Sequence, residues 1–285
     1  MSKKGKKTAV KEKEEEGQKK ESREESASEE REKTRKKTAS RREVDVDSWI
    51  ERNIDEVVSR AGLDYLSLDR ELWFEVLRDV LADLYGSTTS YKSADDITKR
   101  LVRSSERVLP VIAARLAHVL DNPSADQLEF IVVNIGDAVL DLAPRIYTWI
   151  GRSGRKDLLG TLKYKWSSTW SRTRTPVLPI ACPRCGFNSL MPDLTCIVCG
   201  HSTTEKELKE SIGFSSRLRE LLNSVDCSEL KKLANYDYVL VNDIEIKPPS
   251  FNRLPIDVEV YLSKTDKEMV REAYRSRCSS SEATQ

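Results

Sequence analysis

The sequence predicts a mainly α-helical protein that combines an acidic helical bundle, a four-cysteine module and a small α/β domain. Three observations support this fold class. Apolar residues recur at i, i+3 and i+4 spacing from about residue 45 to 151. Four cysteines fall within Cys182–Gly200, and short β-branched runs alternate with helical segments after residue 203. The expected domains are a charged tail at 1–43, the bundle at 44–151, a basic aromatic strand or linker at 152–176, the cysteine module at 177–202, the α/β domain at 203–278 and a loose tail at 279–285.

The composition indicates a charged cytoplasmic protein without a membrane partner. One third of the 285 residues are charged, and no apolar run approaches the roughly 18 residues that a transmembrane helix needs. Nothing at the N-terminus is typical of a signal peptide, which favours a reducing cytoplasm. Gln is scarce while Lys, Arg and Glu are abundant, a bias of thermophile proteins, so we expect a hyperthermophilic, archaeal source.

The net charge of +1 conceals a strong segregation of charge along the chain. Residues 1–43 hold 16 basic and 11 acidic side chains, and residues 44–151 hold 11 basic and 19 acidic ones. Residues 152–176 hold 7 basic residues against 1 acidic residue. The most basic block therefore comes directly before the cysteine module.

The first 43 residues are expected to be disordered, because Val10 is their only large aliphatic residue and they contain no aromatic residue. Blocks of Lys and Arg alternate there with runs of Glu. The segment is either a basic arm that attracts a polyanion or a solubilising tail.

Helices are predicted throughout residues 45–151. The first two should begin at Ser48, in a capping box with Glu51, and after Ser67. A third should begin at Ser93, and a fourth should cover about 108–121 with Pro110 in its first turn. Ser124 and Gln127 form a second capping box, ahead of an apolar helix that runs through Leu142 and is followed by further helical turns to Ile150.

Two Cys-x-x-Cys pairs dominate the centre of the chain. Ten residues separate Cys182 and Cys185 from Cys196 and Cys199, and a Gly follows each pair. Two thiolates at this spacing can face one ion only if the backbone turns tightly, and Gly lets the chain leave that turn with positive φ. Four sulfurs leave no open coordination position, so the predicted metal site is structural. Pro192 and Asp193 predict a turn in the connecting hairpin.

The module resembles a zinc ribbon of the rubredoxin-like, two-knuckle kind over about residues 178–201, and no family is recognised for the rest of the chain. This resemblance implies one structural Zn²⁺ on the four cysteines. Two disulfides, or a redox motif, are the alternatives. Zinc ribbons serve transcription, translation and nucleic-acid handling, and also act as docking modules. The other cysteines, Cys227 and Cys278, are expected to be free thiols.

The basic stretch before the module is predicted to be a strand, because apolar or aromatic residues alternate with Lys from Leu162 to Trp166. Rings between cations favour single-stranded nucleic acid, whose bases stack on the rings while cations follow the phosphates. The alternative is that the rings pack the module onto the bundle. The predicted nucleic-acid contacts are Lys163, Tyr164, Lys165, Trp166, Trp170, Arg172 and Arg174.

The C-terminal domain is expected to hold three short helices at 204–213, 215–224 and 227–235. Strands follow at 238–241, 244–246 and 258–262, and a helix at 263–277 closes the domain. Three helices before a hairpin is the order of a winged helix, with Lys247–Arg253 as the wing. A small α/β domain that supports the cysteine module is the other, favoured interpretation.

Function is expected to be binding and not catalysis. The sequence has no Gly-rich phosphate loop, no nucleophile elbow and no open metal position. We therefore expect a non-enzymatic zinc protein of the transcription, translation, replication or RNA-processing machinery that contacts RNA or DNA through the basic stretch. The alternative is an adaptor or scaffold subunit whose cysteine module and acidic bundle dock partner proteins.

Overall fold

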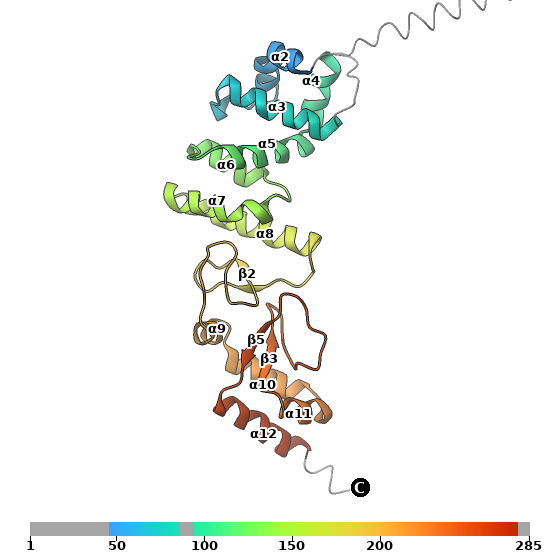
Figure 1. Cartoon of the computed structure of the whole chain (residues 1–285), viewed down its shortest axis with the longest axis vertical. Helices are drawn as coiled ribbons and strands as arrows, with labels where there is room; N and C mark the ends of the chain where they lie inside the picture. The colour runs from blue at the N-terminus through green and yellow to red at the C-terminus, as the bar shows by residue number, and fades with distance from the viewer. Residues whose placement is uncertain (1–45, 86–93, 279–285) are drawn as a thin grey trace, which may run out of the picture. The chain divides into compact units, whose positions relative to one another are not determined.

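A computed structural model describes residues 46–85 and 94–278 and is mostly helical, as predicted. Its backbone contacts divide the chain into two compact units at Val108 and Leu109 (Figure 1). Both predicted tails, Gly86 and the predicted cap Ser93 lie outside the described residues. Within the described ranges, no helix has the length and apolar character needed to cross a membrane.

The first unit contains α2 (Val46–Arg60), the short 3₁₀ helix η1 (Asp64–Leu66), α3 (Arg70–Tyr85) and α4 (Ala94–Arg103). Helix α2 packs against α3 and α4. The apolar residues that predicted the first helix all lie in this core: Trp49, Ile50, Ile54, Val57 and Val58.

Two predicted helix starts are wrong. Helix α2 already includes Ser48, so this residue does not cap it. Helix α3 begins after Asp69, whose carboxylate accepts a hydrogen bond of 2.7 Å from the backbone N–H of Leu72. A short carboxylate side chain satisfies one of the free N–H groups at a helix start, which is the role predicted for Ser67.

The second unit begins with most of α5 (Ser105–Val119), a helix that crosses the division between the units. Helices α6 (Ala125–Asn134), α7 (Val139–Ser153) and α8 (Leu159–Thr173) follow, with the 3₁₀ helix η2 (Lys156–Leu158) before α8. The predicted capping box is confirmed, since the side chains of Ser124 and Gln127 each accept the other's backbone N–H. Pro110 lies inside α5, not in its first turn.

The apolar helix predicted through Leu142 is interrupted between Asn134 and Val139. Gly136 lies in the break, where an added Cβ would be 3.1 Å from Cβ of Pro110. That approach is tighter than most Cβ contacts, so a side chain at position 136 would require a small shift of Pro110. The break separates α6 from α7.

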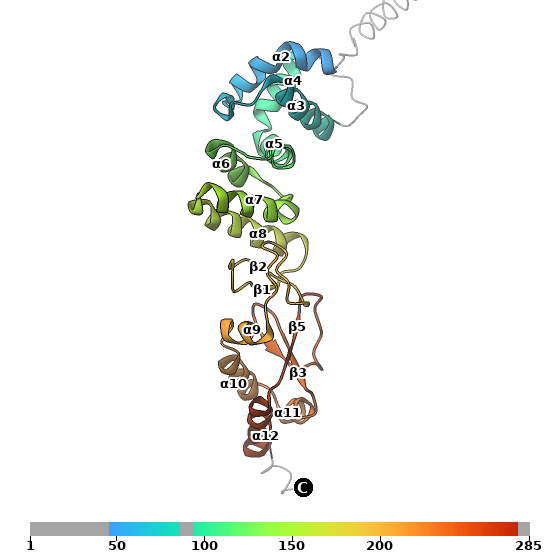
Figure 2. The ribbon, with the colours of Figure 1, turned by 60° about the vertical axis from the view of Figure 1, so that its left-hand side comes forward.

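Residues 159–173 form helix α8, so the predicted strand is wrong. Leu162, Trp166 and Trp170 recur every four residues and share the buried side of α8. This helix packs against α6 and α7, and Figures 1 and 2 both show α7 and α8 side by side. The basic stretch is thus part of the helical layer, not a linker.

The cysteine module follows α8 and contains the antiparallel strands β1 (Ile180–Ala181) and β2 (Asn188–Leu190). Three helices come next, as predicted: α9 (Glu205–Ser211), α10 (Phe214–Ser224) and α11 (Cys227–Leu233). Thr204 caps α9 and Asp226 caps α11 through side-chain hydrogen bonds.

The C-terminal sheet has three antiparallel strands in the order β4-β3-β5. They are β3 (Tyr238–Val241), β4 (Ile246–Lys247) and β5 (Val258–Tyr261), and α12 (Lys264–Cys278) follows. Helix α12 packs against α10 and α11, and Figure 2 shows α10 and α12 next to each other.

A buried ion pair fixes the segment that the winged-helix interpretation assigned to the wing. Lys247 Nζ lies 2.8 Å from an Asp257 carboxylate oxygen, and the two side chains are 6% and 0% exposed. Asp257 also accepts from the Asn242 amide at 2.9 Å and from the backbone N–H of Leu254 at 2.6 Å. Both ends of the segment from β4 to β5 are therefore anchored inside the domain.

The expectation of two free thiols outside the module is wrong. Cys227, the first residue of α11, forms a disulfide with Cys278, the last residue of α12. The two cysteines are 51 residues apart in sequence, and they meet because α11 and α12 pack together.

Serine at both disulfide positions should lower the free energy of unfolding of the C-terminal domain by about 2–4 kcal/mol, because the unfolded chain loses a long covalent loop. Urea denaturation of the Cys227→Ser/Cys278→Ser variant measures this loss. Alkylation of the denatured, unreduced and metal-free wild-type chain should label the four module cysteines and spare these two. Labelling of all 6 cysteines would contradict the disulfide.

The Lys247→Met substitution should destabilise the fold by about 3–5 kcal/mol, because it leaves the Asp257 carboxylate buried without its cation. Lys232→Met is the matched control, since Lys232 pairs with Glu229 on the surface and its side chain is 52% exposed. The control should cost less than about 1 kcal/mol. Equal losses of unfolding free energy in the two variants would show that the buried pair stabilises the fold no more than the surface pair does.

Candidate metal centre

The two Cys-x-x-Cys segments fold into the same turn. In the first, the N–H of Gly186 donates to the carbonyl of Cys182 at 2.8 Å, and in the second Gly200 donates to Cys196 at 2.9 Å. Both Gly residues have positive φ, 71° and 68°. This conformation is accessible to Gly without steric cost, which explains the Gly after each pair.

Further backbone bonds close each knuckle. The N–H of Cys182 donates to the carbonyl of Phe187 at 2.8 Å, and that of Cys196 donates to the carbonyl of His201 at 2.9 Å. His201 thus contributes a backbone acceptor, while the metal-binding cluster found among the described residues consists of the four cysteines. Because both segments form the same turn, the two pairs of thiols point toward a common centre.

The predicted turn between the knuckles is confirmed. The N–H of Leu194 donates to the carbonyl of Met191 at 2.8 Å, and the Asp193 carboxylate accepts from the N–H of Thr195 at 3.0 Å. The Asp193 side chain mimics a backbone acceptor, which is the usual reason for Asp in a turn. The connection returns the chain from the first knuckle to the second.

The four sulfurs lie within 4.8 Å of one another. The Sγ atoms of Cys182 and Cys199 are 3.8 Å apart, and those of Cys185 and Cys196 are 3.7 Å apart. A tetrahedral ion with metal–sulfur bonds of about 2.3 Å requires sulfurs about 3.8 Å apart. The donor set therefore fits one metal ion, and no disulfide links these cysteines.

Hydrogen bonds around the cluster favour thiolate at Cys196. Its sulfur lies 3.7 Å from the Cys185 thiol, 3.1 Å from the Ser189 hydroxyl and 3.4 Å from the backbone N–H of Cys199. Donation by Cys185, Ser189 and the backbone lowers the pKa of Cys196 below its ordinary value. The same hydrogen bond to Cys196 and burial raise the pKa of Cys185.

The first knuckle packs on helices α7 and α8 through Phe187. The Phe187 ring lies edge-on to Tyr147 at 5.9 Å and to Trp166 at 6.5 Å between centroids. Trp166 Nε1 donates to the carbonyl of Asn188 at 3.1 Å, and Lys163 Nζ lies 5.6 Å from the centre of the Phe187 ring. Burial, followed by the nearby Cys185 and Cys199 sulfurs, raises the pKa of Tyr147.

The opposite side of the module is bound to the C-terminal sheet. The Asn188 amide donates to the Asp243 carboxylate at 2.8 Å and to the carbonyl of Pro179 at 3.1 Å. The N–H of Asp243, in the turn between β3 and β4, donates to the carbonyl of Leu178 at 3.4 Å. The module is thus attached both to the helical layer and to the sheet.

The aromatic residues predicted to stack on bases divide into two groups. Trp166 and Trp170 are only 1% and 8% exposed, and their rings stack on each other with centroids 5.9 Å apart. Neither ring presents a face to an incoming base, so the prediction of stacking on these two residues is wrong. Tyr164 is 73% exposed, because it lies on the outer side of α8.

The predicted cations also differ in their surroundings. Lys165 is half-buried and lies 3.4 Å from the carbonyl of Ile135, and burial lowers its pKa. Arg172 forms an exposed ion pair with Asp137. The ammonium group of Lys163 lies over the Phe187 ring of the first knuckle. Arg174 is the residue directly after α8, and its side chain is exposed.

The residues that surround the sulfurs were not predicted from the sequence. Ser189 and Phe187 both lie inside the module, and Tyr147 comes from α7. An aromatic residue directly after Gly186 was the one available signal for the contact with the helices. The Ser189 hydroxyl could not be foreseen, because its contact with Cys196 depends on how the second knuckle returns to the first.

Comparisons with protein-family models, curated proteins and solved structures found no match for this chain.

The wild-type chain should bind one metal ion, and Cys182→Ser should abolish that binding, because four sulfurs form the site. Ser189→Ala should weaken metal affinity by about 10–100-fold, since it removes a hydrogen bond to a ligand sulfur. Competition with a chromogenic chelator measures both effects. Ser168→Ala, on the exposed side of α8, is the control and should leave affinity unchanged. Undiminished metal in the Cys182→Ser protein would contradict the four-cysteine site.

Proposed function

We propose that this chain is a non-enzymatic zinc protein that associates with nucleic acid through the outer face of α8 and the first cysteine knuckle. The observation that carries the proposal is the local charge balance, since residues 152–176 hold 7 basic residues against 1 acidic residue. Arg184, on the exposed part of the first knuckle, adds a cation close to Tyr147 of α7.

Zinc is the metal that suits the site best. Four thiolates form a soft, closed tetrahedral donor set, and Zn²⁺ accepts this set without a preferred geometry of its own. The sulfur separations of 3.7 and 3.8 Å agree with zinc–sulfur bonds of about 2.3 Å. Such an ion stabilises the fold of the module, as the resemblance to a zinc ribbon implies, and supplies no open position for chemistry.

The proposed contact surface is narrower than the one expected from sequence. It consists of Lys163, Tyr164, Arg174 and Arg184, and it leaves out Arg172, which is held in its ion pair with Asp137. Cations at these positions can follow a phosphate backbone, and the exposed Tyr164 ring offers one stacking face. Trp166 supports this surface from inside, because its ring packs against Phe187 of the module, and the ring of Trp170 stacks on that of Trp166.

A protein adaptor is the second candidate function, and a specific observation favours it. Asp137 already neutralises Arg172, while Asp157 and Glu129 neutralise Arg155 within the same basic block. Paired cations attract phosphates less strongly than free ones. In this interpretation the cysteine module and the acidic helices dock partner proteins.

The triple variant Lys163→Ala/Arg174→Ala/Arg184→Ala should bind nucleic acid more weakly and with a flatter salt dependence. Each lost phosphate contact reduces the slope of log K against log salt by about 0.7–0.9, so three lost contacts reduce it by about 2 to 3. Fluorescence anisotropy with labelled single-stranded RNA, single-stranded DNA and duplex DNA at several salt concentrations measures the slope.

The control for this experiment replaces three exposed cations elsewhere in the second unit, Lys206, Arg219 and Arg271, by Ala. It removes the same net charge away from the proposed surface. Equal effects of both triple variants on the salt slope would show that binding depends on overall charge and not on the proposed surface. An unchanged slope for Lys163→Ala/Arg174→Ala/Arg184→Ala would exclude these three residues as phosphate contacts. Absence of binding to all three probes would favour the adaptor function.

A further inference from the structure

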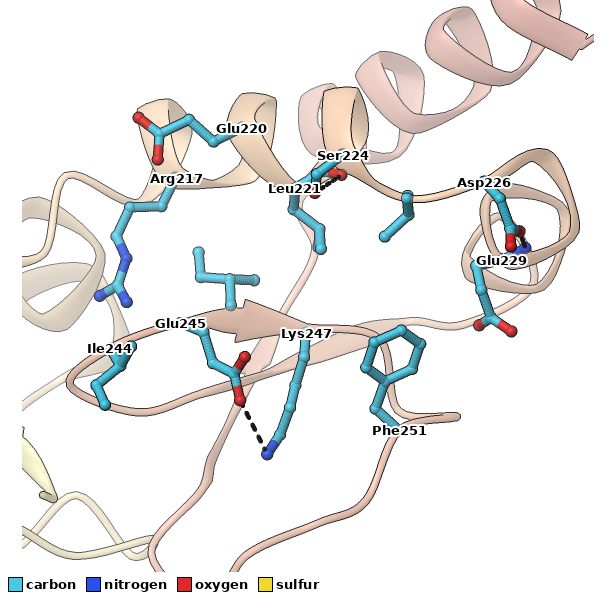
Figure 3. A pocket seen from close by; sticks show the side chains of 12 residues that line it. Arg217, Glu220, Leu221, Ser224, Asp226, Glu229, Ile244, Glu245, Lys247 and Phe251 are labelled. Carbon is cyan, nitrogen blue, oxygen red and sulfur yellow. Dashed lines mark hydrogen bonds and ion pairs between the residues drawn. The ribbon is translucent and has the colours of Figure 1, made fainter. Parts of the chain in front are cut away.

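A groove in the C-terminal domain lies between α10 with the start of α11 on one side and β4 with its flanking loops on the other (Figure 3). Its volume is about 570 Å³. The apolar lining comes from both sides: Leu221 and Val225 from the helical side, and Ile246 from β4. Figure 3 shows Ile244 and Arg217 at one end of the groove and Phe251 at the other.

Among the described residues, no strand pairs with the outer edge of β4, which borders this groove. The sheet order β4-β3-β5 makes β4 an edge strand. Val241 pairs with Ile246, and the next pair toward the turn is bonded from the N–H of Asn242 to the carbonyl of Glu245 at 3.1 Å. Because such pairs alternate along an antiparallel ladder, the N–H and C=O of Ile246 point away from β3. These groups are a template for one more strand.

Two large apolar side chains at the rim remain exposed. Ile244 is 69% exposed and Phe251 is 45% exposed, and both line the groove. Side chains of an added strand would alternate between the apolar lining and the solvent, because successive residues of a strand point to opposite faces. The groove therefore offers pockets for every second residue of an extended segment.

Carboxylates outnumber cations among the residues that line the groove. Its acidic lining residues are Glu220, Asp226, Glu229 and Glu245, and its cations are Arg217 and Lys247. Lys247 is engaged by buried Asp257 and by Glu245, Glu229 is paired with Lys232, and Arg217 donates to the carbonyls of Asn242 and Asp243. The negative charge that remains in the lining is therefore that of Glu220 and Asp226. A ligand with cationic residues complements this lining.

We propose that the groove binds an extended segment of a partner protein, which adds a strand to the free edge of β4. The segment carries aliphatic residues at alternate positions, facing Leu221, Val225 and Ile246, and Lys or Arg between them on its solvent side, where their charge complements the net negative charge of the groove. Main-chain bonds to Ile246 supply affinity and the alternating side chains supply specificity. The basic residues 1–43 of this chain hold only Val10 as a large aliphatic, so they match the charge but not the apolar lining. The site is independent of the nucleic-acid surface proposed above.

The test uses the full chain and a fluorescein-labelled peptide, Lys-Val-Lys-Ile-Arg-Val. We expect saturable binding, at least about tenfold weaker binding of the charge-reversed peptide Glu-Val-Glu-Ile-Glu-Val, and slower amide hydrogen exchange at Ile246 when the first peptide is bound. Ile244→Asp and Phe251→Asp should each weaken binding by about tenfold or more. Both side chains are exposed, so these changes leave the core intact.

Val133→Asp is the matched control, since Val133 is an exposed aliphatic residue on α6, and it should bind the peptide as wild type does. Three results would each overturn the proposal. They are no binding of the first peptide up to about 1 mM, equal binding of the charge-reversed peptide, or binding that is unaffected by both groove variants. Binding of the first peptide without slower amide hydrogen exchange at Ile246 would contradict the proposal that the peptide adds a strand to β4.

Discussion

Four thiols held within 4.8 Å of one another are the constraint on which the rest of the second unit depends. Sulfurs at this distance repel one another once they ionise, so a cation at their centre stabilises the arrangement. Two identical turns create the convergence, and each turn requires Gly at positive φ. The module is small, and contacts of Phe187 with Trp166 and Tyr147 connect it to the helices. Helices, sheet and sulfurs therefore stabilise one another.

The sequence was most informative where local chemistry decides the structure. The Cys-x-x-Cys turns, the capping box at Ser124 and the turn at Asp193 each depend on residues within a few positions, and all are present. The i, i+3 and i+4 spacing of apolar residues in the first helix also identified its buried residues correctly. In these places the short-range hydrogen bonds and the packing demand the same conformation.

The failures come from longer-range interactions or from patterns too short to distinguish two periods. From Leu162 to Trp166 the residues alternate as in a strand, but Leu162, Trp166 and Trp170 also fit a helix, and packing against α7 favours the helix. The Cys227–Cys278 bond and the Lys247–Asp257 pair join residues distant in sequence. A disulfide agrees with the expected cytoplasmic location chiefly for a hyperthermophile, whose intracellular proteins often contain disulfides.

The disulfide also affects how the C-terminal domain can be degraded. It closes a covalent ring that runs from Cys227 to Cys278 and contains the entire three-stranded sheet. An unfolding machine that pulls on the C-terminal end meets Cys278 first, and the force passes through the disulfide directly to Cys227. The sheet between them bears no tension, and a narrow translocation channel must admit three strands of chain at once, the segment before Cys227 and the two arms of the closed loop. Processive degradation from this end would therefore require reduction of the bond or a channel wide enough for all three strands.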